Sequence, residues 1–136
     1  MTDRKRILVA DDDADLLDFL KAALTRAGYD VATVDNGRDA LTAILSERGP
    51  DLVLLDVMLP YVDGYHIAQE AVTKLGDKTP PIMILSCRDA GREKGIALMS
   101  GAIDFVQKPF EIDDLQKRVE RLLSGAKDGQ EGRPSE

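Results

Sequence analysis

Short runs of apolar residues alternate along this chain with longer segments in which apolar residues recur at helical spacing. The runs ILVA, LVLL and IMIL are apolar at every position, as is typical of strands buried on both faces of a sheet. The run at residues 29–34 has mixed polarity, which favours a position at a sheet edge. The pattern predicts five strands, at residues 7–10, 29–34, 52–55, 82–85 and 104–107.

The segments between the predicted strands carry the apolar stripes of amphipathic helices. In the first segment leucines recur on one face, Asp13 is placed to cap the helix, and Gly28 ends it. The third helix is expected near residues 65–75 and the fourth around residues 92–99. This alternation predicts an α/β fold with a doubly wound, five-stranded parallel sheet, flavodoxin-like with strand order 2-1-3-4-5.

The composition indicates one folded domain. The chain has 136 residues, of which 43% are hydrophobic and 32% charged, enough for one apolar core. We expect the domain to occupy residues 1–124. Residues 125–136, GAKDGQEGRPSE, are charged and rich in glycine, so we expect a disordered tail or the start of a linker. The domain is thus expected either to stand alone or to be the front part of a longer protein whose linker begins at Gly125, and the stand-alone domain is the preferred interpretation.

The charge and the lack of long apolar runs exclude several classes of partner. A formal net charge of -7 repels nucleic acid and anionic membranes, so neither is an expected partner. No apolar run approaches the roughly 20 residues that cross a bilayer. A single cysteine cannot form an internal disulfide. These features predict a cytoplasmic location.

Polar residues stand at the carboxyl ends of four predicted strands. Asp11 and Asp12 follow the first strand, Asp56 the third, Ser86 the fourth and Lys108 the fifth. In a doubly wound sheet these ends border one crevice, where the strand order reverses. Carboxylates gathered there raise one another's pKa values unless a cation lies among them, and Mg²⁺ prefers carboxylates together with water and phosphate oxygens. The sequence therefore predicts a magnesium-dependent phosphoryl site.

Asp56 is the predicted nucleophile of this site. It stands alone at its strand end, whereas Asp11 and Asp12 are placed to share the metal. Carboxylates form covalent aspartyl phosphates in other proteins. Lys108 would supply a second cation and Ser86 a hydroxyl donor to the phosphoryl group.

Four motifs carry a resemblance to a known family. In chain order VADDD, LLDVMLPYVDG, ILSC and GAIDFVQKPF resemble the receiver domain of bacterial two-component response regulators, which is CheY-like. The resemblance covers roughly residues 6–124. A lone DD or KP is weak evidence, but these features in this order at the strand ends are specific.

The resemblance implies a role for each site residue. Asp56 would accept a phosphoryl group from a phosphohistidine on a sensor histidine kinase or a histidine phosphotransfer protein. Mg²⁺ would be bound directly by Asp12 and Asp56, through water by Asp11, and by the backbone carbonyl of Met58. Lys108 would pair with the phosphoryl oxygens.

The resemblance also implies a conformational switch. Ser86 takes the position of the switch hydroxyl, and Phe105 that of the switch aromatic, which turns inward when Ser86 moves toward phosphate. The Lys108-Pro109 peptide bond is expected to be cis. Phe105 lacks the hydroxyl of the tyrosine often found there. Cys87 stands where a smaller residue is common, and packing as a small hydrophobe is favoured over a redox role.

The predicted function is a phosphoryl-accepting signalling switch that assists its own phosphorylation and dephosphorylation and is not a turnover enzyme. Phosphate would shift the surface of the fourth helix, fifth strand and fifth helix, toward a downstream protein target, an effector domain or a phosphorylation-dependent dimer. The alternative is a phosphohydrolase of the haloacid-dehalogenase type with a strand-one aspartate as nucleophile. Against it, the segment DDDAD at residues 11–15 lacks the threonine of D-x-D-x-T, and the chain has no room for a cap domain.

Overall fold

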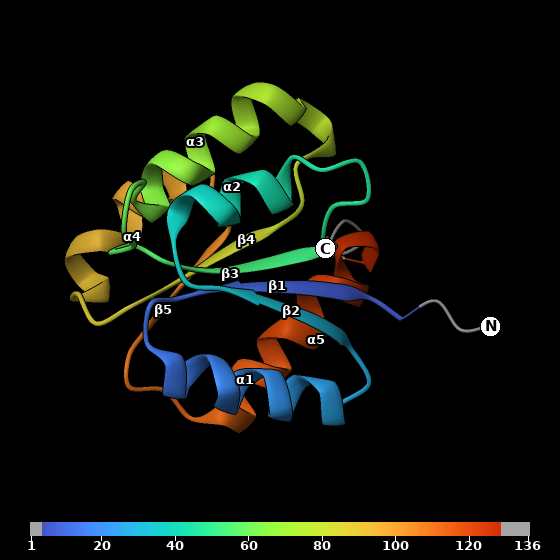
Figure 1. Ribbon diagram of the computed structural model, residues 1–136. Coiled ribbons are helices and arrows are strands. Elements are labelled where there is room, and N and C mark those ends of the chain that lie inside the picture. Colours follow the sequence, from blue (N-terminus) through green and yellow to red (C-terminus); the bar gives the residue numbers. More distant parts are fainter. Residues whose placement is uncertain (1–3, 129–136) are drawn as a thin grey trace.

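The centre of the molecule is a parallel sheet with helices on both faces (Figure 1). The computed structural model describes residues 4–128. The strands are β1 (Arg6–Ala10), β2 (Asp30–Val34), β3 (Leu52–Asp56), β4 (Ile82–Ser86) and β5 (Asp104–Gln107). They pair in parallel in the order β2-β1-β3-β4-β5. The predicted fold class and strand order are confirmed.

The helices divide into two layers. They are α1 (Ala14–Arg26), α2 (Gly37–Ile44), α3 (Gly64–Leu75), α4 (Ala90–Met99) and α5 (Ile112–Asp128), with a short 3-10 helix at Gly76–Lys78. Figure 1 shows α1 and α5 on one face of the sheet and α2, α3 and α4 on the other. Side chains of β1 alternate between the layers, since Ile7 packs with the α1 and α5 side and Leu8 with the other. Each face of the sheet therefore has its own apolar core.

Two sequence expectations about local structure are confirmed. All five residues of β3 are buried, as expected for a central strand. Asp13 caps α1, since its carboxylate accepts hydrogen bonds from the backbone N–H groups of Asp15 and Leu16 at 3.1 and 3.2 Å. Both β3 and β4 extend one residue beyond the predicted strands, to Asp56 and Ser86. Two of the predicted site residues are therefore held by the sheet itself.

Two helix boundaries differ from the prediction. α4 begins at Ala90, two residues before the expected start, because the carboxylate of Asp89 accepts a hydrogen bond from the Gly91 N–H at 3.0 Å and caps the helix. α5 continues to Asp128, four residues into the segment predicted to be a tail. A helix anchored by its packed turns extends cooperatively at its free end. Residues 129–136 lie outside the described residues, and the division at residue 124 stays a prediction.

Gly64 allows α3 to begin against the end of β3. Its backbone N–H donates to the Val57 carbonyl at 2.8 Å. A Cβ atom at this position would lie 2.4 Å from the Asp56 carbonyl oxygen and 2.9 Å from the Val57 Cα. Both neighbours are backbone atoms, so a side chain here displaces the strand end that carries Asp56.

We expect Gly64→Ala to lower the free energy of unfolding by about 1 to 3 kcal/mol because of this overlap. Gly95→Ala is the matched control. Gly95 lies inside α4, and a Cβ atom added there would have no neighbour within 4 Å, so alanine should raise stability by roughly 0.5 to 1 kcal/mol. Urea denaturation of both variants measures the two changes. Equal changes of the same sign would contradict the close approach at Gly64.

Candidate functional site

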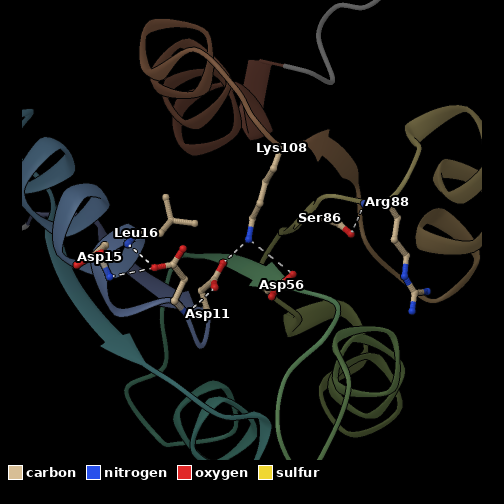
Figure 2. Close-up of polar contacts among 8 residues, drawn as sticks. Asp11, Asp15, Leu16, Asp56, Ser86, Arg88 and Lys108 are labelled. Carbon is tan, nitrogen blue, oxygen red and sulfur yellow. Dashed lines mark hydrogen bonds and ion pairs between the residues drawn. The ribbon is translucent and has the colours of Figure 1, made fainter.

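The carboxyl ends of the central strands bring the predicted site residues together. Asp11 follows β1, Asp56 ends β3, Ser86 ends β4, and Lys108 follows β5. Figure 2 shows the Lys108 side chain directed toward Asp11 and Asp56, with Ser86 on the next strand. The sheet register explains this meeting, since Ala10 pairs with Leu55, and Asp56 with Leu85. Residues far apart in the sequence thus share one edge of the sheet.

Three carboxylates form an acidic cluster, defined here as Asp11, Asp12 and Asp56. One oxygen from each lies within 4.8 Å of the others. Asp11 and Asp56 are 1% and 7% exposed, whereas Asp12 is exposed to solvent. All the donors are carboxylate oxygens, which is the chemistry that Mg²⁺ binds. The acidic cluster therefore fits a hard divalent cation.

Burial raises the pKa of Asp56 to about 6, and the nearby Asp11 carboxylate contributes to this rise. Lys108 and the backbone N–H groups of Met58 and Val57 act in the opposite direction. The result leaves a carboxylate that ionises near neutral pH at a free-energy cost to the fold. A cation among the carboxylates would remove much of that cost.

Lys108 supplies a positive charge next to the acidic cluster. Its Nζ lies 2.7 Å from Asp11 Oδ2 and 3.8 Å from Asp56 Oδ1. Burial lowers the pKa of Lys108, but the hydrogen bond to Asp11 and the charges of Asp56 and Asp11 outweigh this effect and raise it overall. The ammonium group stays charged and links the two buried carboxylates.

Asp11 and Asp12 differ in how their carboxylates are bound. Asp11 accepts from Lys108 through Oδ2, and from the Asp13 backbone N–H through Oδ1 at 2.9 Å. Within residues 4–128 no hydrogen bond or ion pair involves the Asp12 carboxylate. The Asp11 carboxylate is thus held in place by the protein, while the carboxylate oxygens of Asp12 are available to bind a cation.

The predicted switch residues lie beside the acidic cluster. Ser86 is buried, and its Oγ accepts a hydrogen bond from the Arg88 N–H at 3.1 Å. Phe105 is 4% exposed and packs in the core on the α2, α3 and α4 side, so its inward position is the one this structure holds. The Lys108-Pro109 peptide bond is cis, as predicted. Cys87 is exposed, so the expectation that it packs as a small hydrophobe is wrong.

One part of the site was missed by the sequence analysis. A hollow of about 380 Å³ beside the end of β3 is lined by Val57, Met58, Leu59, Asp63, Tyr65 and Arg88. The Glu93 carboxylate on α4 binds both Tyr65 and Arg88. These residues come from three different segments, and no spacing in the sequence connects them. A tyrosine after the DG turn was the only available signal.

The known proteins that this chain resembles in sequence are response regulators. The family model described as "Response regulator receiver domain" matches residues 7–120. Response regulator MprA from Mycolicibacterium vanbaalenii is 41% identical over 118 residues, which are 87% of this chain and 50% of MprA. DNA-binding response regulator MtrA from Mycobacterium tuberculosis is 40% identical over 122 residues, 90% of this chain and 52% of MtrA. The chain thus spans about half the length of these relatives.

Solved structures are similar over nearly the whole described chain. The receiver domain of the Francisella response regulator 1452 has a TM-score of 0.83 and 32% identity, covering 90% of this chain and 99% of that one. Response regulator protein TrrA from Thermotoga maritima, solved in complex with Mg²⁺-BeF, has a TM-score of 0.76 and 34% identity, covering 88% and 99%. In the described residues no helix is long and apolar enough to cross a membrane.

The raised pKa of Asp56 predicts a pH-dependent stability. The ordinary aspartate pKa of about 3.9 in the unfolded chain lies below the folded value. The protonated carboxyl of Asp56 therefore stabilises the folded state fully below about pH 4. This contribution to the free energy of unfolding is lost as pH rises through about 6. We expect Asp56→Asn to be more stable than wild type by about 2 kcal/mol at pH 7, and equal to it at pH 4.

Urea denaturation at both pH values measures this difference. Asp18→Asn is the control, because Asp18 is an exposed aspartate on α1. It should show little change at either pH. A less stable Asp56→Asn variant at pH 7 would mean that the ionised carboxylate stabilises the fold, contrary to the burial argument.

Proposed function

Because the chain belongs to the response regulator receiver domain family of two-component signalling, we propose that Asp56 is its phosphoryl acceptor. The family acts in signalling rather than as metabolic enzymes, and its match to this chain leaves the haloacid-dehalogenase alternative unsupported. The observation that carries the proposal is the position of Asp56. Its carboxylate ends a fully buried strand, next to two further carboxylates and within 3.8 Å of the Lys108 ammonium.

The proposed reaction is an in-line transfer to a carboxylate oxygen of Asp56. The bond between phosphorus and the donor's histidine nitrogen breaks, its electron pair stays on the imidazole, and a new bond joins phosphorus to Asp56. Lys108 is positioned to neutralise charge on the phosphoryl oxygens, since its Nζ already lies between Asp11 and Asp56. The same groups would assist dephosphorylation when water replaces the donor.

Mg²⁺, when bound in the acidic cluster, would neutralise the phosphoryl and carboxylate charges. Asp12 and Asp56 are the proposed direct ligands, with Asp11 acting through water and the Met58 carbonyl completing the protein ligands. The contacts of Asp11 support this division, because both of its oxygens are already engaged by Lys108 and Asp13. The exposed Asp12 has no such partners among the described residues.

The proposed partners follow from the same chemistry. The phosphoryl donor would be a sensor histidine kinase or a histidine phosphotransfer protein. The output would pass through α4, β5 and α5, where Ile96, Met99 and Ile103 are exposed, to a downstream protein target or an effector domain. A phosphorylation-dependent dimer and a cytoplasmic location stay predictions. Direct nucleic acid binding by this domain is not expected at a net charge of -7.

Phosphorylation is tested by intact-mass analysis after incubation with acetyl phosphate. Wild type should gain the mass of one phosphoryl group in Mg²⁺ and much less in EDTA. Asp56→Asn should gain none, because the amide lacks a nucleophilic oxygen anion. Asp18→Asn, exposed on α1, is the matched control and should behave as wild type. A stable phosphoryl group on the Asp56→Asn variant would sink the assignment of Asp56.

Magnesium binding is tested by thermal unfolding over a range of Mg²⁺ concentrations. A ligand that binds only the folded state raises Tm, and the rise at a given concentration grows with its affinity. Asp12→Asn should weaken Mg²⁺ binding at least about 10-fold, since a charged ligand is lost. Asp13→Asn should keep wild-type affinity, because Asp13 caps α1 and asparagine caps equally well. Equal losses in both variants would refute the division of roles.

A further inference from the structure

α4 is joined to the rest of the domain by few apolar contacts. Among its residues only Ala97 is buried, whereas Ile96, Leu98 and Met99 are 49%, 46% and 88% exposed. The helix also contains two glycines, which lower helix stability relative to alanine. Polar contacts therefore matter more for α4 than for the other helices.

Two polar contacts hold the N-terminal turn of α4. The Ala90 backbone N–H donates to Gln107 Oε1 at the end of β5, at 2.9 Å. The Glu93 carboxylate is the second anchor. Its Oε1 accepts from the Tyr65 hydroxyl on α3 at 2.6 Å and lies 3.4 Å from Arg88 Nη1. The Tyr65 hydrogen bond lowers the pKa of Glu93, despite an opposing effect of desolvation, and Arg88 lowers it further, so the carboxylate stays ionised.

Arg88 connects this anchor to the phosphoryl site. Its backbone N–H donates to Ser86 Oγ, and its side chain lines the hollow beside Met58. Figure 2 shows the guanidinium directed away from Asp56. The Arg88 side chain is 43% exposed and bound to one shared oxygen of Glu93. A weak ion pair therefore holds the Arg88 side chain at α4, while the Arg88 backbone lies beside Ser86 at the phosphoryl site.

We propose that Arg88 changes its ion-pair partner when Asp56 is phosphorylated, from Glu93 on α4 to the phosphoryl oxygens. This inference rests on the proposed function of Asp56. The exchange would remove the charged partner of Glu93 and leave its carboxylate bound to the Tyr65 hydroxyl alone, which weakens one of the two polar anchors of the N-terminal turn of α4. A weaker anchor loosens a helix that has little apolar packing to compensate, and this would connect the phosphoryl site to the surface of α4.

The charges favour this exchange. A phosphoryl group carries close to two negative charges and three acceptor oxygens, which match the fork of donors on a guanidinium. Glu93 offers Arg88 one oxygen that Tyr65 already shares. Lys108 binds Asp11 in the same site, so it does not by itself satisfy every phosphoryl oxygen. After the exchange, the Tyr65 hydroxyl still satisfies the Glu93 carboxylate.

The test is hydrogen exchange of the α4 peptides, followed by mass spectrometry, with phosphorylation measured by intact mass in the same samples. Wild type should exchange faster over residues 90–96 after treatment with acetyl phosphate and Mg²⁺ than before it. In Arg88→Ala this increase should shrink about 2- to 5-fold, the equilibrium factor of a partly exposed ion pair. Glu93→Gln removes only the charge, and should exchange faster before any phosphorylation.

Lys94→Ala is the matched control. Lys94 is an exposed cation on the same helix with no ion pair in the described part of the chain, and this variant should keep the wild-type increase. If Arg88→Ala is phosphorylated and shows the full increase, or if Glu93→Gln exchanges as wild type does, the partner exchange is wrong while the function of Asp56 stands. If wild type gains no phosphoryl group, both proposals fall together.

Discussion

The structure depends most on the charge balance between two buried carboxylates and one lysine. Asp11 and Asp56 lie almost out of contact with water, where two like charges repel strongly. Lys108 lies 2.7 Å from one and 3.8 Å from the other. Even so, the pKa of Asp56 stays raised to about 6. Burial is the largest cause of this rise and the Asp11 carboxylate adds to it, so one ammonium group offsets the two effects only in part. The negative charge that remains would favour a bound cation.

The fold produces this imbalance as a consequence of its topology. A parallel sheet in the order β2-β1-β3-β4-β5 brings the carboxyl ends of β1 and β3 side by side, so residues that follow these strands must meet. Gly64 lets α3 begin directly against the backbone of Asp56, at the same end of β3. Two well-packed apolar cores stabilise the fold. They offset the unfavourable free energy of placing these like charges close together.

The sequence predicted those features that depend on local patterns. Continuous apolar runs located β1, β3 and β4, and a polar residue directly after each run located Asp11, Asp56 and Ser86. The boundary of α4 was missed because the cap residue Asp89 is followed by Ala90 and Gly91 rather than by an apolar stripe. The contact of Glu93 with Tyr65 spans 28 residues and joins α4 to α3. Such a contact depends on tertiary packing and leaves no periodic trace in the sequence.

The helices α1 and α4 differ in how firmly apolar side chains hold them to the sheet. Three leucines bury α1 against the sheet, whereas α4 buries only Ala97. A coupling free energy between two sites is typically 1 to 3 kcal/mol, too small to move a helix anchored by several buried leucines, each worth roughly 1.5 to 3 kcal/mol. The same free energy is comparable with the polar contacts that hold the N-terminal turn of α4. Under the proposed function, a change of charge at Asp56 would therefore alter α4 and leave α1 in place.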